Sequence, residues 1–256
     1  MRSPVSDVGG CPPPTVTDDE VAAFAERGFH AVERITTDDE VTHLRDVYDR
    51  VLGVEGALRL VYEDAAAPEA ERARIEQIFA PELVAPELLE TTYLANARVL
   101  AARVLGVDAS DVEQGGIMLI AKPAGLGLET PFHQDEAYWD FEGSRLSHSA
   151  SVWMPLDEVS VDSGCMQFMP GTHRGEGLLH HTKPDPRKPL YLEPPIDTSA
   201  AVPCPLPAGG ATVHHCRTVH GTAPNTSNRS RRAITTIFHG PPTTRRIPQE
   251  RPWLRQ

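Results

Sequence analysis

The sequence is poor in cysteine, and its few cysteines lack the spacing of a functional motif. Four are present, Cys11, Cys165, Cys204 and Cys216, and none forms a C-x-x-C pair. This pattern excludes a zinc ribbon and a dithiol redox motif. Because cytosolic proteins rarely keep disulfides, we interpret the four residues as reduced thiols and expect a cytoplasmic protein.

Long apolar runs and basic clusters are missing as well. No stretch approaches the roughly 18 apolar residues of a transmembrane helix, and residues 1–14 lack the apolar segment of a secretory signal. The 24 Lys and Arg residues are outnumbered by 36 Asp and Glu, giving a net charge of -12 at pH 7. Phosphate contacts need clustered basic residues. We therefore expect no nucleic-acid partner and no membrane partner, but a small-molecule substrate bound by a monomer or a homodimer.

The chain changes character near Gly106. With 256 residues and 40% hydrophobic content, it is predicted to form one domain over residues 1–256. Residues 1–14 are expected to be a disordered lead-in and residues 15–106 a mainly helical part. Capping boxes at Thr17–Glu20 and Thr37–Glu40 predict the first two helices, and helical spacing recurs over residues 69–79 and 87–105.

Residues 107–240 are predicted to form a β core. They carry most of the Gly and Pro, and short apolar runs at 117–120, 150–154 and 233–238 are typical of strands. Residues 183–207 are rich in proline and are expected to form a long loop, and residues 241–256 a surface tail. No βαβ alternation, G-x-G-x-x-G or P-loop appears. The expected fold class is mainly β with flanking α-helices.

Two short segments carry the strongest chemical signal, an H-x-D pair and a distant histidine. They are Phe132-His133-Gln134-Asp135 and Val219-His220-Gly221-Thr222. In a strand, His133 and Asp135 project to the same face. Imidazole and carboxylate ligands suit Fe(II), and His133, Asp135 and His220 match the two-His-one-carboxylate triad of non-haem iron oxygenases. The alternative is a chance surface pair, since the chain has 11 histidines.

The residues around these ligands form a series of blocks. They are M-L-I-A-K-P at 118–123, P-F-H-Q-D-E-A-Y-W at 131–139, V-W-M-P-L-D at 152–157, S-G-C-M-Q-F-M-P-G-T-H at 163–173, H-G-T at 220–222 and S-R-R-A-I at 230–234. In this order, and over nearly the whole chain, they resemble the phytanoyl-CoA dioxygenase family. The resemblance implies a double-stranded β-helix (jelly-roll) core. It also implies Fe(II) and 2-oxoglutarate as cofactors, with O2 as the oxidant.

The same resemblance assigns roles to further residues. His133, Asp135 and His220 would be the catalytic iron ligands. Arg231, eleven residues beyond the distal histidine, would bind the far carboxylate of 2-oxoglutarate, and Arg232 is its rival because neighbours on a strand face opposite ways.

Other matching positions are open to two interpretations. Trp153, Thr222 and Lys122 match cofactor-binding positions of the family, although a core role for Trp153 and a surface role for Lys122 are alternatives. Tyr138 and Trp139 are candidates for the substrate pocket or for core packing. His173 and His215 are further candidates for the substrate pocket.

The expected activity is oxidation of an unactivated C–H bond of a small organic molecule, with release of succinate and CO2. Hydroxylation is favoured over chlorination, because related halogenases replace the aspartate of the triad with a small residue and Asp135 is present. Desaturation, epoxidation, epimerisation and ring formation can start from the same hydrogen abstraction and are alternatives. A bacterial secondary metabolite, as in antibiotic biosynthesis, is the preferred substrate, since coenzyme A would need a cationic rim. The alternatives are a fatty acyl-CoA hydroxylase, a catalytically inactive metal-binding jelly roll and a zinc hydrolase.

Overall fold

A computed structural model describes residues 11–64, 67–139, 145–146, 148–175, 177–183, 188–241, 243–244 and 251–254. Residues 1–10 of the expected lead-in and most of the expected tail lie outside these ranges. Residues 11–14 form no helix or strand. All four cysteines are free, in agreement with the sequence-based interpretation.

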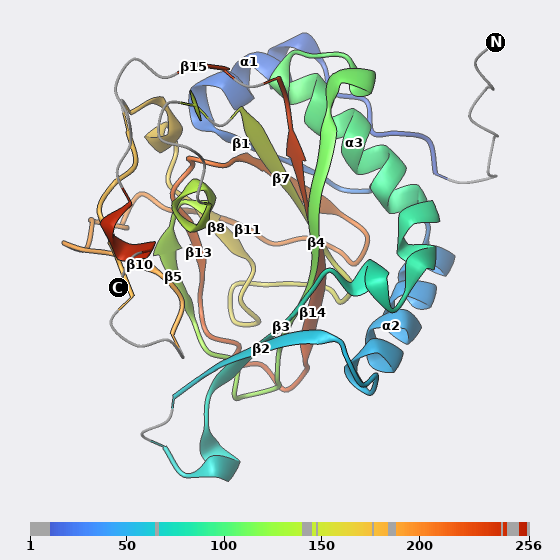
Figure 1. Cartoon of the computed structure of the whole chain (residues 1–256), viewed down its shortest axis with the longest axis vertical. Helices are drawn as coiled ribbons and strands as arrows, with labels where there is room; N and C mark the ends of the chain where they lie inside the picture. Colours follow the sequence, from blue (N-terminus) through green and yellow to red (C-terminus); the bar gives the residue numbers. More distant parts are fainter. Residues whose placement is uncertain are drawn as a thin grey trace.

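Two β-sheets form the jelly-roll core (Figure 1). The larger sheet has the order β1-β12-β7-β14-β4-β3-β2. Its strands are β1 (Phe29–Val32), β12 (Ala211–His215), β7 (Ser149–Pro155), β14 (Arg231–His239), β4 (Glu113–Lys122), β3 (Arg74–Phe79) and β2 (Leu58–Glu63). The smaller sheet is β11 (Val202–Cys204), β8 (Met166–Phe168), β13 (His220–Thr222) and β5 (Thr130–His133). Short pairs join β9 (His181–Thr182) to β10 (Tyr191–Leu192) and β6 (Arg145–Leu146) to β15 (Thr243–Thr244).

Three helices pack on the larger sheet: α1 (Asp18–Arg27), α2 (Asp38–Leu52) and α3 (Thr92–Leu105). Their apolar stripes and the outer face of the sheet share one buried cluster, which includes Leu44, Val51 and Leu100. Single 3-10 turns complete the fold at Glu69–Glu71, Pro81–Leu83, Pro86–Glu90, Ala109–Asp111, Asp135–Tyr138 (η5), Thr172–Arg174 (η6) and Pro252–Leu254 (η7).

Strand alternation divides the larger sheet into a helix-facing side and an inner side. On β7, Val152 and Met154 belong to the cluster under the helices, whereas Trp153 belongs to a second cluster between the two sheets. On β14, Ile234 faces the helices and Ala233 faces inward. The inner faces of β7 and β14 therefore supply side chains to the space between the sheets.

The sequence-based predictions of structure are confirmed at most elements and differ from the structure at two segments. The three α-helices and the strands β4, β7 and β14 occur where expected. The helix expected over residues 69–79 is instead a 3-10 turn followed by β3. Ile75 and Ile78 have helical spacing, but both are β-branched, and β3 pairs with β2 and β4 across the sheet. The expected loop over residues 183–207 contains β10 and β11.

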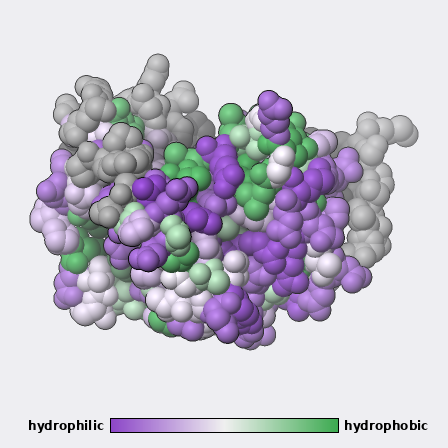
Figure 2. Space-filling view, turned by 90° about the horizontal axis from the view of Figure 1, so that it is seen from below, coloured by the Kyte–Doolittle hydropathy of each residue, from purple (hydrophilic) through white to green (hydrophobic). Residues whose placement is uncertain are grey.

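One face of the molecule can be characterised by its hydropathy. The face seen from below in Figure 1 is covered largely by hydrophilic residues, with hydrophobic patches between them (Figure 2). Among the described residues, no helix has the length and apolar character needed to cross a membrane.

Candidate metal and cosubstrate site

His133, Asp135 and His220 meet between the two sheets because of strand pairing. His133 is the last residue of β5 and His220 the first of β13, and the two are direct partners in the antiparallel register. Asp135 opens η5 directly after β5. Although β5 ends at His133, Gln134 keeps an extended backbone with φ -116° and ψ 131°. His133 and Asp135 therefore project to the same side, as the strand period predicts.

The three side chains present their donor atoms to one point. Asp135 Oδ1 lies 3.6 Å from His133 Nε2 and 3.4 Å from His220 Nε2. One ligand atom from each residue lies within 4.8 Å of the others. Two imidazoles and one carboxylate at such distances can hold a divalent metal ion, and their donor set fits Fe(II).

Backbone carbonyls fix both imidazoles. His133 Nδ1 lies 2.8 Å from the carbonyl oxygen of Pro131, and His220 Nδ1 lies 2.9 Å from that of Thr218. A ring that donates through Nδ1 carries its lone pair on Nε2, where the metal would be. Burial lowers the pKa of His133, which favours the neutral, ligating form.

The second carboxylate oxygen of Asp135 is held by two other donors. Ser151 Oγ donates to Oδ2 at 2.6 Å, and His214 Nε2 lies 3.1 Å from the same atom. Burial alone would raise the pKa of Asp135, but the electrostatic interaction with His220 and hydrogen bonds from the surrounding imidazoles outweigh it, and the pKa lies well below its ordinary value. The carboxylate therefore stays ionised, as a metal ligand must.

A cavity of about 110 Å³ is lined by these three ligands and by Arg231. The Arg231 side chain is buried, and its Nε and Nη1 have no hydrogen-bond partner among the residues that the structure describes. Its guanidinium carbon lies 5.5 Å from the centre of the Trp153 ring. Burial lowers the pKa of Arg231 to about 10, so the group remains cationic near neutral pH. A buried, unsatisfied cation in a cavity is suited to a carboxylate ligand.

Arg232 is excluded as the anchor in this cavity. It points to the helix side of the sheet, where Nη2 donates to Asp157 Oδ1 at 2.9 Å and Nη1 donates to Asp49 at 3.2 Å. The choice that the sequence left open between Arg231 and Arg232 is thus decided by strand alternation.

The three other predicted cofactor-binding residues lie around Arg231. Trp153 and Thr222 line the cavity. Lys122 is the register partner of Arg231 and is fully buried, so the surface role considered for it is wrong. Its Nζ donates to Thr222 Oγ1 at 2.5 Å and to the carbonyl of Ala223 at 2.8 Å, and burial together with Arg231 lowers the pKa of Lys122 well below its ordinary value.

The predicted substrate-binding residues divide into two groups. Tyr138 stands edge-on to His133, with ring centres 5.5 Å apart, and accepts a hydrogen bond from the Leu190 amide. Trp139 packs on His239 at 5.5 Å. Neither lines the described part of the cavity.

His173 and His215 lie away from the metal ligands. Their rings contact each other at 5.4 Å on the other side of β12. Contrary to the expectation, His215 does not line this cavity. On a strand only one of two neighbours faces inward, and on β12 that residue is His214. His173 is near the carbonyl of Ala25 and does not line the cavity.

Sequence reasoning missed His214 and Ser151. Ser151 is two residues before Trp153, so the strand period alone would have placed both on one face. The tandem His214-His215 indicated one inward histidine, but only the pairing of β12 with β7 shows which.

A jelly roll that holds two histidines and one aspartate inside, beside a buried arginine, defines the class of non-haem iron oxygenases. The family model of phytanoyl-CoA dioxygenase (PhyH) matches residues 24–233. The chain belongs to the phytanoyl-CoA dioxygenase family.

Relatives in sequence agree with this assignment. Phytanoyl-CoA dioxygenase domain-containing protein 1 of Danio rerio is 33% identical over 128 residues, which cover 48% of this chain and 42% of that protein. The match thus spans less than half the length of this relative. Peroxisomal phytanoyl-CoA dioxygenase of Homo sapiens is 25% identical over 225 residues, 84% of this chain and 66% of that protein.

Solved structures share the fold over more of the chain. EvdO2 from Micromonospora carbonacea var. aurantiaca, in complex with 2-oxoglutarate, is 34% identical with a TM-score of 0.78 and covers 94% of this chain and 97% of that one. SnoK, a non-heme alpha ketoglutarate dependent carbocyclase from nogalamycin biosynthesis, has a TM-score of 0.69 at 24% identity, with 90% and 87% covered. At this level of identity, the similarity to SnoK supports the fold of the chain and not its activity.

Proposed function

We propose that the protein is an Fe(II)- and 2-oxoglutarate-dependent dioxygenase that oxidises an unactivated C–H bond of a small organic molecule. The observation that carries the proposal is the cavity itself. Its lining includes the His133, Asp135 and His220 donors and the Arg231 guanidinium, whose Nε and Nη1 have no partner among the described residues. A metal ion would satisfy the three donors, and a dicarboxylate ligand would satisfy the guanidinium.

The protein's own residues bind, orient and exclude water. His133, Asp135 and His220 would hold Fe(II), and the Arg231 fork would bind the far carboxylate of 2-oxoglutarate. Lys122 orients the Thr222 hydroxyl toward the cavity by donating to its oxygen. When bound, iron and 2-oxoglutarate supply the oxidising power, with O2 consumed and succinate and CO2 released. The apolar side chains of Trp153 and Met166 line the same cavity and would help to exclude water from the bound cosubstrate.

Hydroxylation is the proposed outcome. Asp135 occupies the carboxylate position of the triad, and its second oxygen is held by Ser151 and His214. A retained carboxylate leaves no vacant ligand position of the kind that chloride takes in halogenases. Transfer of oxygen to the substrate is therefore favoured over halogenation.

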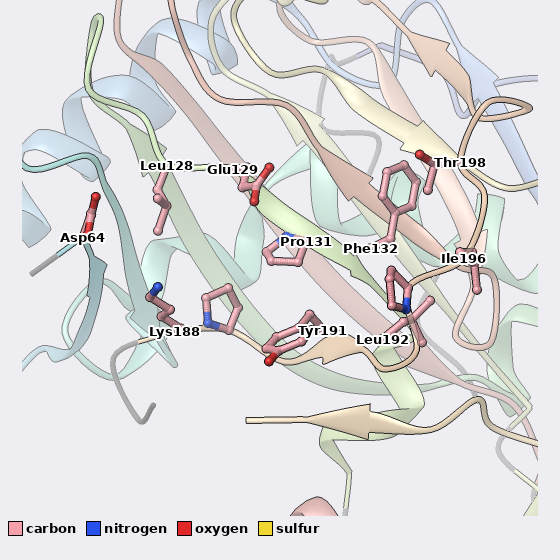
Figure 3. A pocket seen from close by; sticks show the side chains of 12 residues that line it. Asp64, Leu128, Glu129, Pro131, Phe132, Lys188, Tyr191, Leu192, Ile196 and Thr198 are labelled. Atoms are coloured by element: carbon pink, nitrogen blue, oxygen red, sulfur yellow. The ribbon is translucent and has the colours of Figure 1, made fainter. Parts of the chain in front are cut away.

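A groove outside β5 bears on the substrate class (Figure 3). It measures about 620 Å³ and is walled by apolar residues of β5 and β10, among them Phe132 and Leu192. The charged residues that line its described part are Lys188, Asp64 and Glu129. With one cation against two carboxylates, the groove is poorly suited to the phosphates of coenzyme A. Its charge therefore favours a small natural product of a bacterial secondary pathway over an acyl-CoA thioester.

Fatty acyl-CoA hydroxylation is the second candidate. It is favoured by the human relative, whose name is peroxisomal phytanoyl-CoA dioxygenase and which matches 84% of this chain. Parallel screens of acyl-CoA thioesters and of uncharged natural products, each read out as substrate-dependent succinate release, separate the two candidates.

Anaerobic titration of the purified protein with Fe(II) and 2-oxoglutarate tests the proposed cofactors. We expect a weak metal-to-ligand charge-transfer band in the visible that needs both components. The Asp135→Ala variant, which loses one of three protein ligands, should show neither the band nor succinate formation. Near-normal succinate formation by this variant would contradict the assignment. Binding of both components without oxygen-dependent succinate release would indicate an inactive relative, and turnover with zinc alone a hydrolase.

A further inference from the structure

The turn that carries Asp135 is held by the C-terminal segment of the chain. This turn, η5, is a single 3-10 turn, a type of element with poor internal hydrogen bonds. Its geometry must therefore come from contacts with other segments. Two of its carbonyls accept side-chain hydrogen bonds from residues 251–254: Glu136 from Arg251 Nε at 3.3 Å, and Ala137 from Trp253 Nε1 at 2.9 Å.

Glu136 also connects the C-terminal segment to the turn that precedes His220. Its side chain is completely buried, although it follows Asp135 directly. Arg251 Nη2 lies 3.1 Å from Glu136 Oε1, and Arg217 Nε lies 3.7 Å from Oε2. Arg217 lies in the turn before β13, which begins with His220. The ion pairs of Glu136 with Arg251 and Arg217 thus join both ligand-bearing segments to the C-terminal segment.

The other neighbour of Asp135 is pinned as well. Gln134 is completely buried; its Nε2 donates to the carbonyl of Arg217 at 2.7 Å, and its Oε1 accepts from the Leu179 amide at 2.8 Å. Asp135 therefore lies between two buried polar side chains that are both tied to the 216–217 turn. A buried carboxylate is stable only while its hydrogen-bond and ion-pair partners remain in place.

We infer that Arg251 and Glu136 are positioning residues that fix Asp135 and His220 at metal-binding distance. The C-terminal segment is on this inference part of the metal centre, although it contributes no ligand. The inference rests on the proposed function, because it assigns these residues to the iron site of that function. Removal of a group that orients a metal ligand typically weakens metal binding by about ten- to a hundredfold.

The test compares metal affinity with folding in the full-length Arg251→Ala and Glu136→Gln variants. We expect the dissociation constant for Fe(II), or for Co(II) as a spectroscopic substitute, to rise about ten- to a hundredfold. The Co(II) absorption spectrum should also change, since it reports ligand geometry. Arg251→Lys keeps one cationic donor and should recover part of the affinity. Arg50→Ala removes a half-exposed arginine–glutamate pair between α2 and the Pro86–Glu90 turn and is the matched control.

The outcomes are separable. The inference is supported if the variants bind metal more weakly while their circular dichroism spectra stay unchanged and their unfolding stays cooperative. Unchanged metal affinity and an unchanged Co(II) spectrum in Glu136→Gln and Arg251→Ala overturn it. If Arg251→Ala does not fold, Glu136→Gln and Arg251→Lys decide by the same measurements. Failure of the unsubstituted protein to form the Fe(II)–2-oxoglutarate band would instead overturn the proposed function.

Discussion

Arg231 is a cation that is buried away from water. It is 2% exposed and lies against an indole ring, and two of its guanidinium nitrogens have no hydrogen-bond partner in the described part of the chain. Burying a charge without such partners is unfavourable unless a ligand supplies them. The residue therefore fits a site for an anion better than a purely structural role.

Replacement of Arg231 by Ala should weaken 2-oxoglutarate binding. Hydrogen bonds to charged groups contribute about 1.5–3 kcal/mol, so the dissociation constant should rise roughly ten- to a hundredfold. Anaerobic titration of the visible band measures this change. Arg232→Ala is the control, since that side chain pairs with Asp157 and Asp49 on the helix side. A larger effect of Arg232→Ala than of Arg231→Ala would contradict the assignment.

His214 is expected to orient the iron-binding aspartate. His214→Phe keeps a ring of similar shape but removes the donor 3.1 Å from Asp135 Oδ2. We expect metal affinity to fall about tenfold, as is usual when a partner of a ligand is lost. His43→Phe makes the same change at an exposed position of α2, and its metal affinity should stay close to that of the unsubstituted protein. Equal effects of both substitutions, measured by Co(II) titration, would argue against the role of His214.

These two residue pairs show what sequence can and cannot decide. Strand period predicts that only one of Arg231 and Arg232, and only one of His214 and His215, faces the cavity. For arginine, the residue at the family spacing, Arg231, is the one that lines the cavity. For histidine no spacing rule applied, and the register of β12 against β7 was needed.

At the scale of elements, Glu40 connects two helices. The sequence predicts a capping box with Thr37, and the Thr37 side chain does accept from the Glu40 amide at 3.1 Å. The Glu40 carboxylate, however, accepts from the amides of Thr92 and Tyr93 at 2.7 and 2.8 Å, at the start of α3. The carboxylate of α2 thus caps α3, where the positive end of the helix dipole lies.

Glu40→Ala should therefore destabilise the fold without affecting the site. Loss of charge-assisted hydrogen bonds to the first turn of α3 should lower the free energy of unfolding by about 1–3 kcal/mol. Urea denaturation followed by circular dichroism measures the loss. Asp39→Ala, at an exposed neighbouring position, should change stability by less than about 0.5 kcal/mol. Equal losses in the two variants would show that the capping contact is unimportant.

Helices were predictable from their ends, and one strand was not. Thr17 caps α1 and Gly106 ends α3, both local signals that lie within a few residues. β3 forms because β2 and β4 pair with it on both sides. Local spacing of Ile75 and Ile78 holds no information about those partners, so the prediction of a helix there was wrong.

At the scale of the whole molecule, buried neutral histidines make stability depend on pH. Burial lowers the pKa of His181 from 6.5 to about 4 and that of His215 from 6.5 to about 3. Between these values and about 6.5 the unfolded chain binds more protons than the folded one. Stability is therefore complete above pH 6.5 and falls as the pH drops through this window.

Each such histidine contributes a slope of at most about 1.4 kcal/mol per pH unit. Urea unfolding of the metal-free protein at about pH 7.5 and about pH 5.5 should show the fall. His181→Phe should reduce the slope, even though it lowers stability overall by removing the acceptor of the Gln134 amide. An unchanged slope in this variant would mean that His181 does not stay neutral in the folded protein.

The strand pairing that joins His133 to His220 also sets the order of events in biogenesis. A nascent chain exposes its H-x-D segment long before the second imidazole is synthesised, and the two meet only when β5 and β13 pair. The complete set of three ligands therefore exists only once β5 and β13 have paired. A chain that fails to pair them should not form the visible Fe(II)–2-oxoglutarate band, so the band would report that the barrel has closed.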